Sequence, residues 1–269
     1  MFEADIDESS LLFRLGETLG AVWAPVVAGV SAIRQARMFH PSGVVYRGRV
    51  TVATTTPWPD VAARLSGHVL VRLSSAWWKR REWPDVLGVA LRFTRRAEVS
   101  ADATADDQDL LFATARSPWT LPLAPLSTAV HDFFANDYYA VAPFAVDGIG
   151  EGRLRIVPAI PIDRASSPSS SSSRRAKLAQ AVAQGTARWQ LEVKANEGHD
   201  WSPLAEIALT TNVTEQIDQK RLRFSPFRAA RGFSPIGFVQ GLRRATYIAS
   251  QEARPHGEAK SVPRAPLHA

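Results

Sequence analysis

The chain contains no cysteine among its 269 residues, and this absence excludes several kinds of chemistry. Disulfides, thiolate catalysis, iron–sulfur clusters and any zinc or haem held by cysteine are ruled out. A metal centre in this chain must therefore use histidine, tyrosine or carboxylate ligands. No histidine and aspartate occur at metal-ligand spacing, which argues against a metal-dependent hydrolase or phosphodiesterase.

The sequence also lacks a long basic run and a long apolar run. Its formal net charge is +6, but the 32 lysines and arginines are spread along the chain, so nucleic acid is not an expected partner. The apolar stretch at residues 19–33 is short and interrupted by Pro25, so we expect no membrane span. The N-terminus is acidic where a secretory signal would be basic, which predicts a cytoplasmic protein.

The central part of the chain consists of short β-rich runs separated by Gly, Pro and Ser. No long helical pattern lies between these runs, and about eight of them point to an antiparallel barrel or sandwich. A hydrophobic fraction of 45% allows a sizeable core in one domain of this size. The runs occupy residues 43–55, 68–75, 85–94, 109–114, 138–146, 153–160, 188–195 and 204–212.

The segments on either side of the β-rich part have a different character. Leucines and valines recur at helical spacing after Ser9, a plausible helix cap, and Pro25 should kink or break this helix. The end of the chain has no apolar periodicity and is expected to be disordered. We therefore divide the chain into an N-terminal helical arm (1–39), one barrel domain (40–254) and a tail (255–269).

Two irregular segments interrupt the predicted barrel domain. The Ser-rich, low-complexity residues 165–175 predict a mobile loop between strands. The residues that follow, 177–185, predict a short helix that ends at Gly185. After the last predicted strand, residues 223–237 contain two prolines and are interpreted as an irregular arm.

A tyrosine lies between arginines in the sequence "RRATYIASQEAR", residues 243–254. In a helix, Arg243, Tyr247 and Arg254 would lie at roughly 0°, 40° and 20° around the axis, on one narrow face. An arginine one turn away lowers the pKa of a phenol, and phenolate is a good ligand for a metal ion. This stretch alone favours a simpler interpretation, a solvated helix face with a half-buried tyrosine.

His40 stands where the first helix is expected to meet the first strand, an entrance where functional side chains are common. Arg37 lies three residues earlier. In the run at 68–75, Arg72 and Ser74 face the same side of an alternating strand. If that side is the barrel interior, a buried guanidinium there requires an anion beside it.

Five short segments occur in the order and approximate spacing of the haem catalase core: "RMFHPSGVVYRGRV", "VLVRLSS", "DVLGVALRF", "QDLLFAT" and "RRATYIASQEAR". Over roughly residues 34–254 the chain resembles a minimal catalase-like haem peroxidase. The resemblance implies a mainly β, α+β fold. It consists of an antiparallel catalase-like barrel of about eight strands with an N-terminal helix and a C-terminal helix that carries the haem ligand. The implied cofactor is haem b.

The resemblance also implies roles for particular residues. His40 matches the family's distal histidine, a general acid and base, and Ser74 matches its helper serine. Tyr247 matches the axial haem ligand, and Arg243 matches the arginine that stabilises the phenolate form. The substrates would be a small peroxide and an external electron donor.

Other positions match the arginines that pair with the haem propionates, namely Arg37, Arg72 and Arg254. One departure concerns the family's distal asparagine, which by our register falls on Ala113, beside Thr114. An alanine cannot hydrogen-bond a bound peroxide. We therefore predict a peroxidase that reduces organic hydroperoxides, and hydrogen peroxide, with weak catalase activity.

Two alternative functions fit the same features. One is a lipid hydroperoxide dehydratase or isomerase of the allene oxide synthase type, which needs no external donor. The other is a non-enzymatic carrier of haem or an apolar ligand.

Tryptophans and aspartates in the chain allow further interpretations. The tryptophans in residues 76–83 could relay electrons, but packing or an oligomer contact, such as that of a homodimer, is the favoured interpretation. Asp85 and Asp109 stand at predicted strand starts. We interpret them as turn caps rather than as a pair of catalytic carboxylates.

Overall fold

The computed structural model describes residues 42–236, except residues 77, 79–81, 118–119, 121–122, 141, 161–171 and 199. Its strands are β1 (Ser42–Val52), β2 (Gly67–Ser75), β3 (Leu87–Thr94), β4 (Gln108–Ala113), β5 (Tyr138–Tyr139), β6 (Phe144–Val146), β7 (Gly150–Pro158), β8 (Arg188–Ala195), β9 (Ser202–Asn212) and β10 (Phe233–Pro235). Its helices are α2 (Pro59–Ala63), α3 (Ala124–Ser127), the 3₁₀ helix η2 (Phe133–Ala135) and α4 (Arg174–Ala183).

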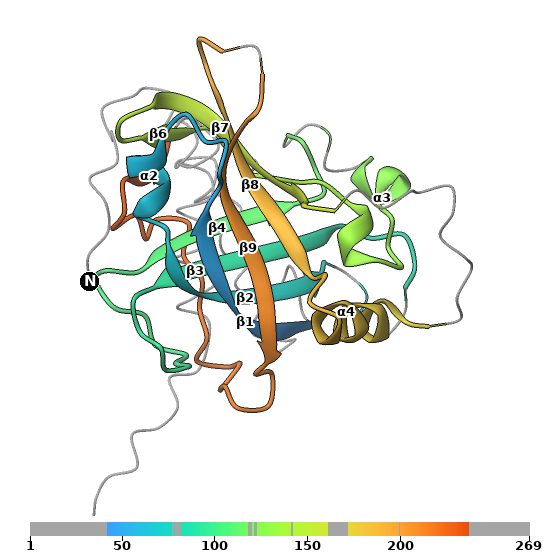
Figure 1. The fold of residues 1–269 in the computed structure, drawn as a ribbon. Helices are drawn as coiled ribbons and strands as arrows, with labels where there is room; N and C mark the ends of the chain where they lie inside the picture. The colour runs from blue at the N-terminus through green and yellow to red at the C-terminus, as the bar shows by residue number, and fades with distance from the viewer. Residues whose placement is uncertain are drawn as a thin grey trace, which may run out of the picture.

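The strands form a closed barrel. They are ordered β10-β6-β7-β5-β4-β3-β2-β1-β9-β8, and an additional pairing of β7 with β8 joins the two sides of the sheet (Figure 1). Closure involves eight strands, because β6 and β10 lie outside the ring, beside one end of β7. Every strand pairing is antiparallel. The predicted mainly β fold with an antiparallel barrel of about eight strands is confirmed.

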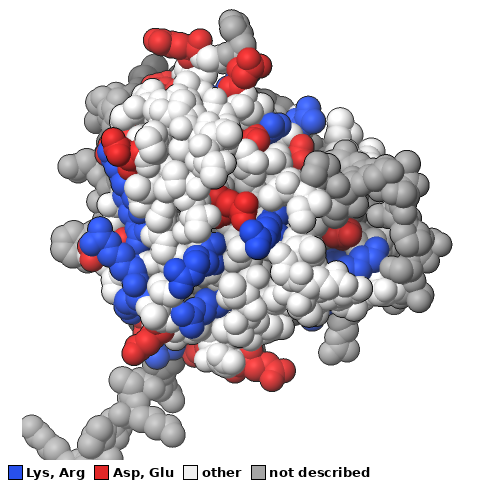
Figure 2. Space-filling view, viewed as in Figure 1, with Lys and Arg blue, Asp and Glu red and all other residues white. Residues whose placement is uncertain are grey.

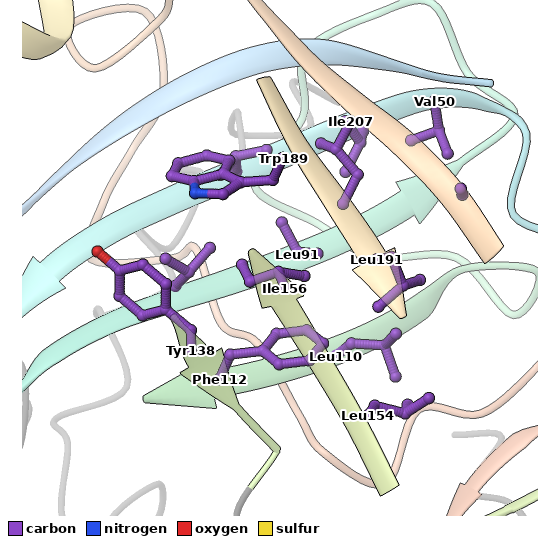
Figure 3. Packing of buried hydrophobic residues seen from close by; sticks show 14 of the residues in the cluster. Val50, Leu91, Leu110, Phe112, Tyr138, Leu154, Ile156, Trp189, Leu191 and Ile207 are labelled. Carbon is purple, nitrogen blue, oxygen red and sulfur yellow. The ribbon is translucent and has the colours of Figure 1, made fainter. Parts of the chain in front are cut away.

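Apolar side chains fill the interior of the barrel (Figure 3). Trp189 on β8 is fully buried and stacks on Phe134 of η2, with ring centroids 4.3 Å apart. Leu178 of α4 joins this core at the same end, and Val61 and Leu65, from α2 and the residues after it, also join it. An eight-stranded barrel is just wide enough for side chains to fill, so a large ligand must bind outside its wall.

A second apolar cluster covers part of the outer surface. It combines Val45 and Leu70, from β1 and β2, with side chains of the segment that follows β9. The contributions of that segment are Val213, Ile217, Leu222 and Phe224. Strands β1 to β4 are therefore covered on both faces around Val45, Leu70, Ala90 and Leu111, on one side by the core and on the other by the chain that follows the last barrel strand.

Asp109 of β4 links the segment that follows β9 to the barrel through ion pairs and a hydrogen bond. Its side chain is completely buried and lies 3.0 Å from Nε of Arg92, and it also pairs with Arg228. The backbone N–H of Ser225 donates a further hydrogen bond of 2.8 Å to the carboxylate. Burial raises the pKa of Asp109, while the two guanidinium groups oppose that change. The prediction that Asp109 caps a turn is wrong, because the residue is the centre of a buried ion-pair cluster.

Asp85, in contrast, has local partners. Its carboxylate accepts hydrogen bonds from the backbone N–H of Trp78, at 3.1 Å, and from that of Val86, at 2.7 Å. It therefore holds the loop before β3, as a turn-capping residue does.

Some boundaries differ from those expected. The run at 138–146 forms two short strands, β5 and β6, rather than one, because Pro143 has no N–H to continue a ladder. Within the predicted irregular arm, Phe233–Pro235 forms β10 and pairs with β6. Helix α4 begins at Arg174, capped by Ser173, and Gly185 follows its end with a φ of +69°. Among the described residues no helix could cross a bilayer, and the longest, α4, has ten residues.

Candidate cofactor site on the outer barrel wall

Strand β2 places Arg72 and Ser74 on the same side, as its alternation predicts. Val71 and Leu73, between and beside them, belong to the interior core, so Arg72 and Ser74 point away from it. The condition raised from the sequence, that this side might be the barrel interior, is therefore not met. Both side chains are nevertheless buried, with exposed fractions of 6% and 5%.

A row of small residues crosses four strands at the level of Ser74. Gly43 on β1 lies opposite Ser74, Ser74 lies opposite Gly88 on β3, and Gly88 lies opposite Ala113 on β4. Residues directly opposite each other on neighbouring strands share one face of the sheet. The row therefore forms a flat strip of outer wall from which no large side chain projects.

Arg72 lies at the edge of this small-residue row. A Cβ atom added to Gly43 would lie 2.9 Å from the guanidinium carbon of Arg72 and 2.8 Å from the carbonyl oxygen of Leu73. Glycine at position 43 thus leaves the space that the guanidinium group occupies. A flat ligand on the row would have a permanent positive charge beside it, suited to a carboxylate.

The surroundings of the row are apolar. Val45 and Leu111 lie one residue pair further along the same face, and Ala76, Val86 and Ala115 lie on the other side of the row. A flat strip with apolar margins and one arginine matches the chemistry of haem, a flat apolar macrocycle with two propionates. The described residues therefore fit one face of that group.

The polar groups available at the row are few. The Ser74 hydroxyl lies 3.5 Å from the carbonyl oxygen of Gly88, a long and weak contact that leaves it free to turn towards a ligand. The Thr114 hydroxyl accepts a hydrogen bond from the N–H of Leu87, at 3.2 Å, and lies 2.8 Å from the Thr128 hydroxyl. Thr114 is thus engaged within the fold, and Ala113 offers only a methyl group.

Sequence reasoning missed Tyr139. It lies opposite Ala113 and points outward, because its neighbour Tyr138 is completely buried in the core. Its ring makes an edge contact with Trp201 at 6.4 Å and lies below the guanidinium of Arg116 at 5.4 Å. Tyr139 therefore ends the small-residue row with an aromatic wall. The alternation of the Tyr138–Tyr139 pair was the signal that could have identified it.

The described residues include only part of the predicted site. It brings Arg72 and Ser74 together with the small-residue row. The other predicted site residues lie outside the described residues, namely Arg37, His40, Arg243, Tyr247 and Arg254. Within the described part of the chain no three His, Asp or Glu side chains are grouped to hold a metal ion.

Comparisons with known proteins agree with the architecture. The sequence matches no protein-family model and no curated protein. The solved structures that are similar to this chain include two catalases. A bacterial catalase is 14% identical, with a TM-score of 0.51, and the match covers 81% of this chain and 57% of that one. A fungal catalase is 13% identical, with a TM-score of 0.55, and the match covers 81% and 59%. The chain thus has a catalase-like fold and spans a little under three fifths of the length of these catalases.

Proposed function

We propose that the chain binds haem b on the outer wall of its barrel and reduces organic hydroperoxides, and hydrogen peroxide, with an external electron donor. The observation that carries this proposal is the row of Gly43, Ser74, Gly88 and Ala113 in register across four strands, with buried Arg72 at its edge. The catalase-like barrel on which the row is built supports it further.

The sequence supplies residues of suitable chemistry to hold haem. Tyr247 would hold the iron through its phenolate form, and Arg243 would favour that form by its charge. Arg72 would pair with a propionate, together with Arg37 and Arg254. When bound, haem would supply redox chemistry at its iron, and the external donor would supply the two electrons that the reduction of each peroxide consumes.

The remaining chemistry belongs to side chains of the protein. His40 would take the proton from the terminal oxygen of the hydroperoxide. It would return that proton to the other peroxide oxygen, which leaves as alcohol or water. Ser74, buried and only weakly hydrogen-bonded, would orient the imidazole by its hydroxyl group.

The row also bears on which peroxide is preferred. Ala113 and Gly88 have no side chain that could hydrogen-bond a second hydrogen peroxide molecule, and the one hydroxyl in the row, that of Ser74, would orient the imidazole. Disproportionation of hydrogen peroxide requires that second molecule as the reductant. An organic hydroperoxide with an apolar group, in contrast, gains by contact with the apolar margins of the row.

We expect the haem-loaded protein to oxidise an aromatic donor with cumene hydroperoxide faster than it evolves oxygen from hydrogen peroxide. Ala113→Asn should raise oxygen evolution about tenfold by adding one hydrogen bond. Ala208→Asn on the outer face of β9 is a matched control and should leave oxygen evolution unchanged. Oxygen evolution far above organic hydroperoxide turnover in the unaltered protein would refute the proposal. Conversion of a lipid hydroperoxide without any donor would instead identify a dehydratase or isomerase.

A further inference from the structure

A second site lies on the same outer wall, at the opposite end of β2. A pocket opens there between β1, β2 and the chain that follows β3. The residues that matter for its chemistry are Arg47, His68, Thr94, Arg96, Glu98 and Ser100. His68 lies six positions before Ser74 on β2, which is about 20 Å at the usual rise of a strand. The pocket is therefore distinct from the small-residue row.

Three arginines and one glutamate are among the residues that line the pocket. Nη2 of Arg47 lies 3.5 Å from Nδ1 of His68, and neither Arg47 nor its neighbour Arg49 forms an ion pair within the described part of the chain. Arg92 and Arg96, which also line the pocket, each pair with a buried carboxylate, that of Asp109 and that of Asp107 respectively. Glu98 is the one carboxylate among the lining residues, and it is exposed.

Burial and nearby positive charge both favour the neutral form of His68. Its pKa is lowered first by burial and then by the charges of Arg47 and Arg49. The other charged groups around it are Arg92, Arg96 and Glu98. His68 lies beside Arg47 and Arg49, which lack ion pairs within the described residues. An anion that binds there would interact favourably with both arginines and would favour the protonated form of the imidazole.

The pocket also contains hydrogen-bond donors for which the described residues supply no acceptor. Nε of Arg96 is buried without a hydrogen-bond partner, although the rest of its guanidinium group contacts Asp107 at 3.6 Å and the carbonyl oxygen of Asp102 at 2.7 Å. The hydroxyl oxygens of Thr94 and Ser100 accept backbone N–H groups, which leaves their O–H groups to donate. A buried donor without a partner is costly unless a ligand fills the site.

We propose that this pocket binds a phosphate group, either as inorganic phosphate or as a small phosphate monoester. A tetrahedral dianion can accept hydrogen bonds from two guanidinium groups, an imidazole and a hydroxyl at once, and arginine suits it geometrically. An extended polyanion fits less well. Acidic side chains lie among the basic ones on the visible face (Figure 2), and arginines such as Arg188 and Arg221 already pair with carboxylates.

The test is a titration of the full-length protein with sodium phosphate at constant ionic strength, followed by NMR of the His68 imidazole, assigned with His68→Gln. The signal should shift and saturate, and phosphate should raise the pKa of His68 because the dianion favours imidazolium. Arg47→Ala should weaken binding at least tenfold through loss of a charge-assisted contact. Arg153→Ala removes an exposed arginine on β7 and should change the affinity less than twofold.

Two further binding experiments distinguish a soluble phosphate from a lipid headgroup. Glycerol 3-phosphate should bind like inorganic phosphate, and vesicles of phosphatidylcholine with phosphatidic acid should not bind. Binding to the vesicles alone would overturn the proposal in favour of a membrane surface. A His68 signal that does not saturate, or equal losses in Arg47→Ala and Arg153→Ala, would overturn it in favour of general charge screening. Because the titration needs no haem, its outcome is independent of the peroxidase proposal.

Discussion

Replacing Asp109 with asparagine should lower the free energy of unfolding by about 3–5 kcal/mol. The carboxylate is completely buried between Arg92 and Arg228, and the exposed fraction of the Arg92 side chain is only 2%. Asparagine has the same shape but no charge. Two guanidinium groups would therefore keep their positive charges in the protein interior without the anion that compensates them. Urea unfolding followed by tryptophan fluorescence measures the change.

The matched control is Asp102→Asn. Asp102 pairs with Arg221 at 2.7 Å, but both side chains are more than 60% exposed. An exposed ion pair contributes at most about 1 kcal/mol. Equal losses in the Asp109 and Asp102 variants would show that the buried cluster does not anchor the segment after β9.

Replacing His40 with alanine should reduce kcat/KM for an organic hydroperoxide by about 10²–10⁴-fold, the usual contribution of a general acid and base. The haem content should not change, since this residue is proposed to move a proton rather than to hold the cofactor. Stopped-flow mixing of haem-loaded protein with cumene hydroperoxide measures the rate, and the visible spectrum measures haem content.

His131→Ala serves as the control for this variant. His131 is 68% exposed, and its Nδ1 lies 3.0 Å from a carboxylate oxygen of Glu82, far in sequence from the predicted site. The control should leave the rate unchanged. If His40→Ala also kept the full rate, the protein would be a carrier of haem rather than a peroxidase.

The sequence predicted the barrel well because its signal is local. Each run of alternating or β-branched residues specifies a strand by itself, and the described structure has a strand in every predicted run. The face of β2 could not be predicted in this way. Seven consecutive residues, from Val69 to Ser75, are buried, so burial on both sides hides which face is the interior. Alternation paired Arg72 with Ser74 but did not show which way they point.

The small-residue row and the buried cluster depend on contacts between distant parts of the chain. Gly43 and Gly88 share one row only because both strands are in register with Ser74. Asp109 was interpreted as a turn cap because its partner Arg228 lies 119 residues away. Such pairings follow from the three-dimensional arrangement, and no pattern within a single segment indicates them.

The central claim is that this chain binds haem, with Tyr247 as the iron ligand and the small-residue row as part of the binding surface. The most direct measurement is the visible absorption spectrum of the protein expressed with a haem precursor, alongside Tyr247→Phe. We predict a high-spin ferric haem spectrum in the unaltered protein and its loss in the variant, because phenylalanine cannot ligate iron. A colourless protein that also rejects added haemin would contradict the account.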